Sequence, residues 1–291
     1  METRKPAVAG QFYPLSEKQC LDEIKEYCPD GYIEGDLPAE IVAGIVPHAG
    51  WVFSGDLAAL VFSAIKQTNP EVDTFVIFGA VHSYMDKLSA VYNRGKWQTP
   101  LGQIAIDEDL ADEIAATKFA HCDCHCHFGE HSIEVQVPFV QYLFPDAKIV
   151  PIMVPPGEWA VLLGLETARI ISQTKDKVIA CIASTDLTHY GPRYGFYPEG
   201  PSPEGIKWAK KINDNSFIDL ALQMDAEKML ESAIENTSAC GPGASAALVA
   251  AAKELGKTKG LLLAHTHSNE VMQKKFNQTS EESVGYAAIV F

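Results

Sequence analysis

The sequence is short of positive charge. Its 291 residues contain 23 Lys and Arg against 38 Asp and Glu, which gives a formal net charge of −15 at pH 7. Proteins that bind the nucleic-acid backbone need a basic surface, and anionic membrane surfaces likewise attract basic segments. We therefore expect neither a nucleic acid nor a membrane as a partner. A small molecule or a peptide remains as the expected class of ligand.

Long apolar runs and an export signal are also missing. No stretch approaches the ~20 apolar residues that a membrane-spanning helix needs, and residues 1–5 lead into no apolar signal-peptide core. The seven cysteines are odd in number, and without an export signal they favour reduced thiols over a disulfide framework. These absences predict a soluble cytoplasmic protein.

One stretch, residues 41–65, combines an apolar strand, a histidine and an amphipathic helix. Residues 41–46 are an apolar, β-branched run typical of a buried strand, and residues 57–65 carry apolar side chains at the spacing of one helix face. Ser54 stands before that face and is predicted to cap the helix. His48 lies in the turn between strand and helix. In open α/β sheets ligands bind beyond the carboxyl ends of the strands, so His48 is a candidate site residue.

The same arrangement, an apolar strand that leads into histidine, recurs three times. The further strands and their histidines are 74–78 with His82, 178–183 with His189, and 261–264 with His265 and His267. A single histidine after a strand is usually a structural residue. Parallel strands, however, bring their carboxyl ends to one edge of a sheet. We therefore expect these histidines to meet there and to form a site.

Helices and strands alternate along the whole chain, and no repeat, low-complexity tract or linker interrupts them. This alternation predicts one α/β domain over residues 1–291, with a central mostly parallel or mixed sheet and helices on both faces. Hydrophobic residues make up 47% of the chain, which is enough for a large core.

Cys240 lies between small residues, in Ser-Ala-Cys-Gly-Pro-Gly, just before a predicted helix that begins near Ala244. The positive end of a helix dipole favours the thiolate, which is both a nucleophile and a metal ligand. A buried, inert cysteine is one alternative, and a Cys/His hydrolase, which needs a single imidazole, is another. Together with His48 and His82, Cys240 would form a three-ligand face with open metal positions.

Several motifs together resemble those of the Memo family. In chain order they are AVAGQFYP, PHAGWVFSG, TPLG, EHSIEVQVPF (residues 130–139), STDLTHYG (residues 184–191), SACGPG and VGYA (residues 284–287). They extend from residue 7 to residue 287 in the family's order, so the resemblance covers nearly the whole chain. It implies an α/β fold like that of the class III extradiol dioxygenases.

The resemblance also implies a set of site residues. His48, His82 and Cys240 correspond to the family's proposed metal ligands, with Fe(II) as the leading metal and copper or zinc as alternatives. His189 would be the acid/base residue, oriented by Asp186. The extradiol enzymes use two histidines and a glutamate, so the sulfur sets this site apart. Two functions remain open: a non-haem metal-dependent oxidoreductase of dioxygenase type acting on an unknown small molecule, or a non-catalytic binding or scaffold protein that keeps the pocket for a metal or a peptide.

Residues 121–131, HCDCHCHFGEH, begin with a stretch, residues 121–127, that lies outside the family pattern. They hold four of the nine histidines and three of the seven cysteines, without the C-x2-C spacing usual for zinc. Consecutive alternate residues of an extended chain are about 6.6 Å apart, too far for easy convergence on one ion. We expect an ordinary surface loop, with a second metal site as the alternative.

Overall fold

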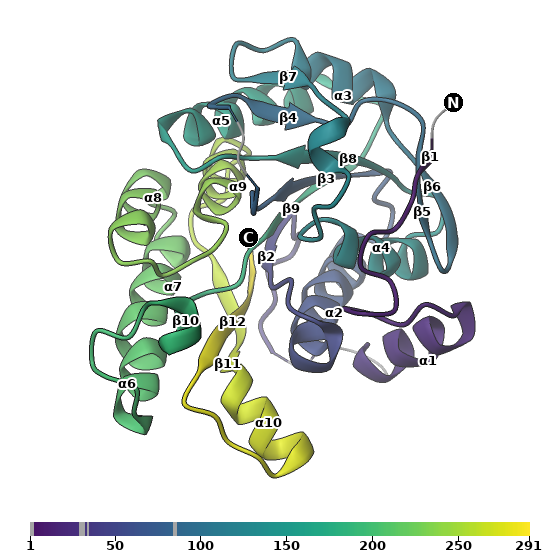
Figure 1. The fold of residues 1–291 in the computed structure, drawn as a ribbon. Coiled ribbons are helices and arrows are strands. Elements are labelled where there is room, and N and C mark those ends of the chain that lie inside the picture. Colours follow the sequence, from purple (N-terminus) through teal and green to yellow (C-terminus); the bar gives the residue numbers. More distant parts are fainter. Residues whose placement is uncertain (1–2, 29–32, 34, 84–85) are drawn as a thin grey trace.

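A mixed sheet runs through the middle of the molecule in the computed structural model, which describes residues 3–28, 33, 35–83 and 86–291 (Figure 1). Its strand order is β10-β12-β2-β9-β3-β8-β4-β7, with β11 paired to β12. The strands are β2 (Ala43–Val46), β3 (Thr74–Gly79), β4 (Ser89–Val91), β7 (Ala120–Cys122), β8 (Lys148–Met153), β9 (Ile179–Ser184), β10 (His189–Tyr190), β11 (Leu261–His267) and β12 (Ser283–Val290). A small second sheet contains β1 (Thr3–Arg4), β5 (Lys96–Thr99) and β6 (Gly102–Ala105).

The four central strands β2, β9, β3 and β8 are parallel. All residues of β2, β3 and β9 are buried, as expected for strands that are covered on both faces. Their carboxyl ends therefore meet at one edge of the sheet. β12 pairs antiparallel with β2, and β4 pairs antiparallel with β8, so the sheet as a whole is mixed. The α/β fold predicted from the sequence is confirmed.

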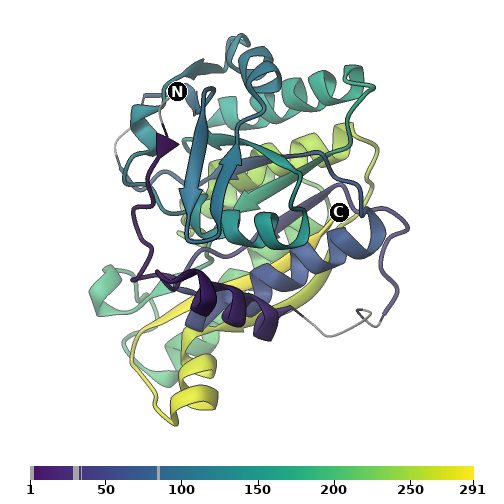
Figure 2. The same ribbon diagram turned by 90° about the vertical axis from the view of Figure 1, so that its right-hand side faces the viewer.

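Helices cover both faces of this sheet (Figure 2). On one face α2 packs on β2 and β12, and α1 and α4 pack against α2. On the other face α9 packs on β2, β3 and β9, and α5 and α8 pack against α9. The helices are α1 (Glu17–Tyr27), α2 (Trp51–Thr68), α3 (Glu108–Ala115), α4 (Val137–Leu143), α5 (Glu158–Gln173), α6 (Pro203–Trp208), α7 (Asn215–Leu222), α8 (Ala226–Glu235), α9 (Pro242–Glu254) and α10 (Ser268–Phe276). None of them is both long enough and apolar enough to cross a lipid bilayer.

The start of α2 differs from the sequence prediction. The helix begins at Trp51, after Gly50, and the prediction that Ser54 caps it is wrong. The Trp51 backbone N–H donates to the Phe12 carbonyl, a contact from a distant part of the chain, so this donor is satisfied without a capping side chain. Ser54 lies inside the helix, and its hydroxyl donates to the Ala49 carbonyl.

Candidate metal centre

His48 follows β2 and is almost fully buried, at 2% exposure. The Asp186 carboxylate holds the turn in place, because its Oδ1 accepts hydrogen bonds from the backbone N–H groups of His48 (2.7 Å) and Ala49 (3.2 Å). Asp186 itself follows β9, the strand next to β2. The ends of two neighbouring parallel strands are thereby tied together at this edge of the sheet.

His82 follows β3 and is held by Glu130. Its Nδ1 lies 3.0 Å from Glu130 Oε1, and its backbone N–H donates to Oε2 at 3.1 Å. Burial lowers the pKa of His82, but the hydrogen bond and the charge of Glu130 outweigh burial and leave that pKa raised. Because Nδ1 is used by the carboxylate, Nε2 is the nitrogen that remains for a ligand.

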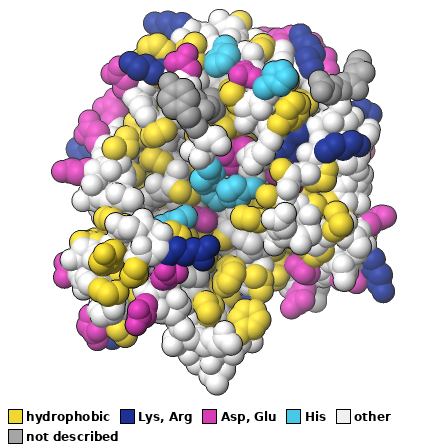
Figure 3. All heavy atoms as spheres, in the orientation of Figure 1, with side chains coloured by type: hydrophobic (Ala, Val, Ile, Leu, Met, Phe, Trp, Pro, Cys, Tyr) yellow, Lys and Arg dark blue, Asp and Glu magenta, His cyan; other side chains and the backbone are white. Residues whose placement is uncertain are grey.

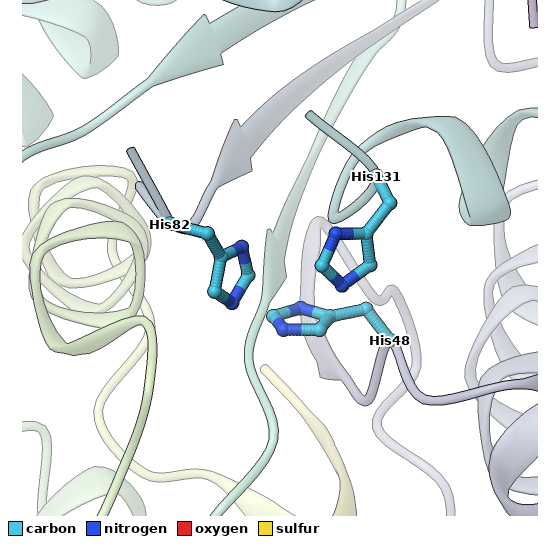
Figure 4. Close-up of side chains that lie close together, drawn as sticks. All are labelled: His48, His82 and His131. Carbon is cyan, nitrogen blue, oxygen red and sulfur yellow. The ribbon is translucent and has the colours of Figure 1, made fainter. Parts of the chain in front are cut away.

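His131 completes a cluster of three imidazoles (Figure 4). One ring nitrogen from each of His48, His82 and His131 lies within 4.8 Å of the other two. The rings of His82 and His131 stack with centroids 4.6 Å apart, and the His48 ring stands edge-on to both. Two donor atoms bound to one ion are at most about 4.3 Å apart, so small movements would let all three share a metal.

Gly79, the last residue of β3, lets the loop with His131 approach. A Cβ at this position would lie 2.4 Å from Ile133 Cγ1 and 2.9 Å from Ser132 Oγ. Any larger residue would therefore push this loop away from the strand end. His131 stands in the EHSIEVQVPF motif but follows no strand, so the sequence pattern does not indicate it as a ligand.

Cys240 lies next to the Nε2 side of the His48 ring. Its Sγ is 3.1 Å from His48 Nε2 and accepts the Asp186 backbone N–H at 3.3 Å. Gly241 makes this approach possible, since a Cβ there would lie 2.9 Å from the Ser184 carbonyl oxygen. Burial, followed by the charge of Asp186, raises the pKa of the Cys240 thiol.

His189 and Asp186 form the next part of the site. His189 Nε2 lies 4.0 Å from Asp186 Oδ2 and, in the part of the chain that the structure describes, has no hydrogen-bond partner although it is buried. Burial lowers the pKa of His189, while Asp186 opposes this shift. Burial also lowers the pKa of His48 and of His131, in each case reinforced by neighbouring histidines. Neutral imidazoles of this kind can coordinate metal or accept a proton.

The cluster forms the floor of a pocket of about 600 Å³. Figure 3 shows histidine side chains near the middle of this face, with apolar side chains below them. The rest of the lining combines aromatic and apolar side chains with polar and charged ones. The former are Phe12, Phe53, Tyr194, Met272, Val284 and Tyr286, and the latter include Arg193 and Glu282. A floor of ligand-type side chains under a partly apolar lining is typical of a site for a small molecule.

Two other histidines do not reach this pocket, although the sequence predicts them at the same edge. His265 Nε2 pairs with Asp214 Oδ2 at 3.1 Å, and His267 Nδ1 lies 3.0 Å from Ser283 Oγ. Both are on β11, which pairs only with β12 and so stands away from the central parallel strands. The prediction that all four strand ends contribute to one site is wrong for this strand.

The His/Cys-rich segment forms β7 and a short 3-10 turn at His125–His127. The Cys126 thiol donates to Asp123 at 2.9 Å. His127 is fully buried; burial lowers its pKa to about 3, and its Nε2 donates to the Ala90 carbonyl. Among the described residues, the group that could hold a metal is His48, His82 and His131, and residues 121–127 contribute nothing to it.

The residues of the pocket fit a divalent transition metal. Imidazole nitrogen suits iron, copper and zinc, and the Cys240 sulfur, 3.1 Å from His48 Nε2, lies beside the group of three imidazoles without being part of it. The buried carboxylate of Glu130 orients His82 in the way that outer carboxylates orient metal-bound histidines.

Two comparisons of the sequence with known proteins agree with each other. A family model described as Memo-like protein matches residues 4–290. A MEMO1 family protein of Thermococcus kodakarensis is 39% identical over 296 residues, covering 99% of this chain and 99% of that protein. A MEMO1 family protein of Pyrococcus furiosus is 38% identical over 295 residues, covering 99% of this chain and 98% of that protein. Among solved structures, an uncharacterized protein of Escherichia coli K12 aligns with a TM-score of 0.46 and 14% identity over 84% of this chain and 99% of that chain.

Proposed function

The chain belongs to the Memo family, and from that premise we propose that it binds Fe(II) in the pocket and acts as a metal-dependent oxidoreductase of dioxygenase type on a small molecule. The observation that carries this proposal is the group of three imidazole nitrogens within 4.8 Å of one another at the floor of a pocket.

The proposed ligands are His48, His82 and Cys240. The approach of Cys240 Sγ to His48 Nε2 supports the sulfur as the third donor. His131 is close enough to be a fourth donor or to replace the sulfur. A soft sulfur beside imidazoles favours iron, copper or zinc over magnesium and calcium, which prefer oxygen.

A bound redox-active metal would supply electron transfer and Lewis acidity to a substrate in the pocket. The chain's own groups would handle the proton. His189, neutral because burial lowers its pKa, has an Nε2 without a hydrogen-bond partner among the described residues, and this nitrogen could accept a proton from a substrate hydroxyl. Asp186 Oδ2, 4.0 Å away, would then stabilise the imidazolium. The aromatic and apolar part of the lining would hold the body of the substrate and exclude water.

The test is metal analysis of protein purified without oxygen, followed by a screen for oxygen consumption with catechols. We expect close to one Fe(II) per chain in the wild type and strong loss of iron in His48→Ala, His82→Ala and Cys240→Ser. If Cys240→Ser retains its iron and His131→Ala loses it, the third ligand is the His131 imidazole and not the Cys240 sulfur. Unchanged iron content in both His48→Ala and His82→Ala would contradict the metal site.

His189→Ala separates the two functions. We expect this variant to keep its metal and to lose turnover, because His189 is assigned to proton transfer and not to coordination. Loss of metal would make His189 a ligand. A wild type that binds iron but consumes no oxygen with any substrate in the screen would favour the alternative role, a binding or scaffold protein for a metal or peptide.

A further inference from the structure

Ser184, the last residue of β9, is fully buried next to His48 and joins three hydrogen-bond partners. Its Oγ lies 2.6 Å from the Ser132 carbonyl oxygen, 3.0 Å from Gln136 Nε2 and 3.1 Å from His48 Nδ1. A serine hydroxyl has one proton to donate and two lone pairs that accept. These three contacts therefore use its whole capacity, and the direction of each can be worked out.

The directions of the first two hydrogen bonds follow because each partner can act only as an acceptor or only as a donor. A carbonyl oxygen only accepts, so the Ser184 hydroxyl proton is donated to Ser132. The Gln136 amide nitrogen lies 2.8 Å from the Pro47 carbonyl oxygen. Turning that amide over would place Oε1 against Pro47 oxygen, so the NH₂ group faces both Pro47 and Ser184. Gln136 thus donates to Ser184, and one lone pair of Ser184 remains.

That lone pair faces His48 Nδ1. Because the Ser184 proton is already committed to Ser132, the contact at 3.1 Å is a hydrogen bond only if Nδ1 carries the ring proton. We infer that Ser184 is a positioning residue that fixes the neutral His48 imidazole as its Nδ1–H tautomer and so leaves the Nε2 electron pair free toward Cys240. A proton on Nε2 would instead leave two lone pairs opposed at Nδ1 and block metal coordination at Nε2.

The two proposed imidazole ligands are therefore oriented by different chemistry. His82 gives its Nδ1 proton to a carboxylate, Glu130, whereas His48 gives it to a neutral hydroxyl. A carboxylate raises the basicity of the ring it orients, and a hydroxyl does so much less. His48 is thus held in the right tautomer without being made easier to protonate.

The test for the tautomer uses metal-free protein with ¹⁵N-labelled histidine and two-bond ¹H–¹⁵N correlation spectra. The His48 signals are assigned by their loss in His48→Ala. We expect the protonated nitrogen to be Nδ1 in the wild type, and Ser184→Ala to shift the ring toward the Nε2–H form. Ser132→Ala is the matched control, since it removes a buried hydroxyl that bonds the Ala80 carbonyl and keeps the Ser132 carbonyl intact. If Ser184→Ala fails to fold, Ser184→Cys keeps the shape but offers only a weak acceptor.

The expected effect on metal binding rests on the proposed role of His48 as a ligand. The expected tautomer of His48 does not depend on that role. We expect Ser184→Ala to weaken Fe(II) binding by about 10- to 100-fold relative to Ser132→Ala, and Ser184→Thr to restore most of it. The inference is overturned if wild-type His48 carries its proton on Nε2, or if Ser184→Ala leaves the tautomer unchanged. A wild type that shows the Nδ1–H form yet binds no Fe(II) would support the tautomer and sink the proposed function.

Discussion

Glu130 links two histidines of the cluster through one buried carboxylate. It accepts hydrogen bonds from the His82 ring and from the backbone N–H groups of His82, His131 and Ser132. Burial opposes ionisation of this carboxyl, but these bonds, led by that from His82, hold its pKa well below the usual range. The position of His131 therefore depends on the charged carboxylate of Glu130. The sequence motif contains this residue but does not show what it binds.

We predict that Glu130→Gln lowers the free energy of unfolding at pH 7 by about 3 kcal/mol, because an amide cannot replace a carboxylate that accepts several N–H groups. A carboxyl whose pKa is depressed on folding stabilises fully above its unfolded pKa, about 4.3, and loses this contribution as the pH falls toward the folded value. Urea denaturation from pH 7 to pH 3 should therefore show a loss of stability at low pH that is smaller in Glu130→Gln. An equal loss in both proteins would mean that Glu130 is not the group responsible.

His48 and His82 could be chosen from the sequence because each follows an apolar strand, and the order of parallel strands then brings them together. His131 could not, because its place depends on a loop packed onto a glycine far away in the chain. His265 and His267 had the right local pattern, but a strand's neighbours in the sheet are not encoded locally, and β11 lies beyond β12. The local sequence pattern therefore identifies the edge of the sheet where the site lies. Packing between distant parts of the chain decides which side chains reach that site.

At the scale of elements, the end of β3 is in close contact with the loop that carries His131. We predict that Gly79→Ala lowers the free energy of unfolding by about 1–3 kcal/mol and weakens metal binding, because the added Cβ would overlap Ile133 and displace the loop with His131. Gly157→Ala is the matched control, since a Cβ at that position has no atom within 4 Å. Thermal denaturation and Fe(II) titration of both variants make the comparison. Equal behaviour of the two variants would show that the loop adapts freely.

The first turn of α3 depends on one buried carboxylate. Asp107 caps the helix through the Leu110 N–H, accepts the Thr74 hydroxyl at 2.7 Å and pairs with Lys177 at 2.9 Å. Burial raises its pKa, but these hydrogen bonds outweigh burial and leave the pKa lowered. The helix is thus tied to the amino end of β3 and to the chain just before β9, at the edge of the sheet opposite the pocket.

We expect Asp107→Ala to lower the free energy of unfolding by about 2 kcal/mol, at the upper end of the range for a helix cap, because Thr74 and Lys177 also lose their partner. Asp225 caps α8 in the same way but at the surface, so Asp225→Ala should cost about 1 kcal/mol. Chemical denaturation of both variants gives the difference. Fe(II) binding should be unchanged in both, and a loss of binding in Asp107→Ala would place α3 in contact with the site.

At the scale of the whole molecule, one hydrophobic core extends from Tyr13 to Phe291 and includes both faces of the sheet. The predicted single domain should therefore unfold as one unit. We expect far-UV circular dichroism and tryptophan fluorescence to give the same transition in urea, because the four tryptophans are spread from Trp51 to Trp208. Two separated transitions would divide the chain into independently stable parts.

The spatial order of the strands in the sheet differs sharply from their order along the chain. β12, the last strand along the chain, lies between β2 and β11, and the Phe291 carbonyl accepts the Val42 N–H. A ribosome that has delivered β2 must add more than 200 residues before β12, the neighbour on the side away from β9, exists. Until then β2 presents an unpaired apolar edge, which is the kind of surface that aggregates or recruits chaperones. Removal of β12 should consequently leave this edge of β2 exposed for good, so a chain that stops before Ser283 should aggregate instead of folding.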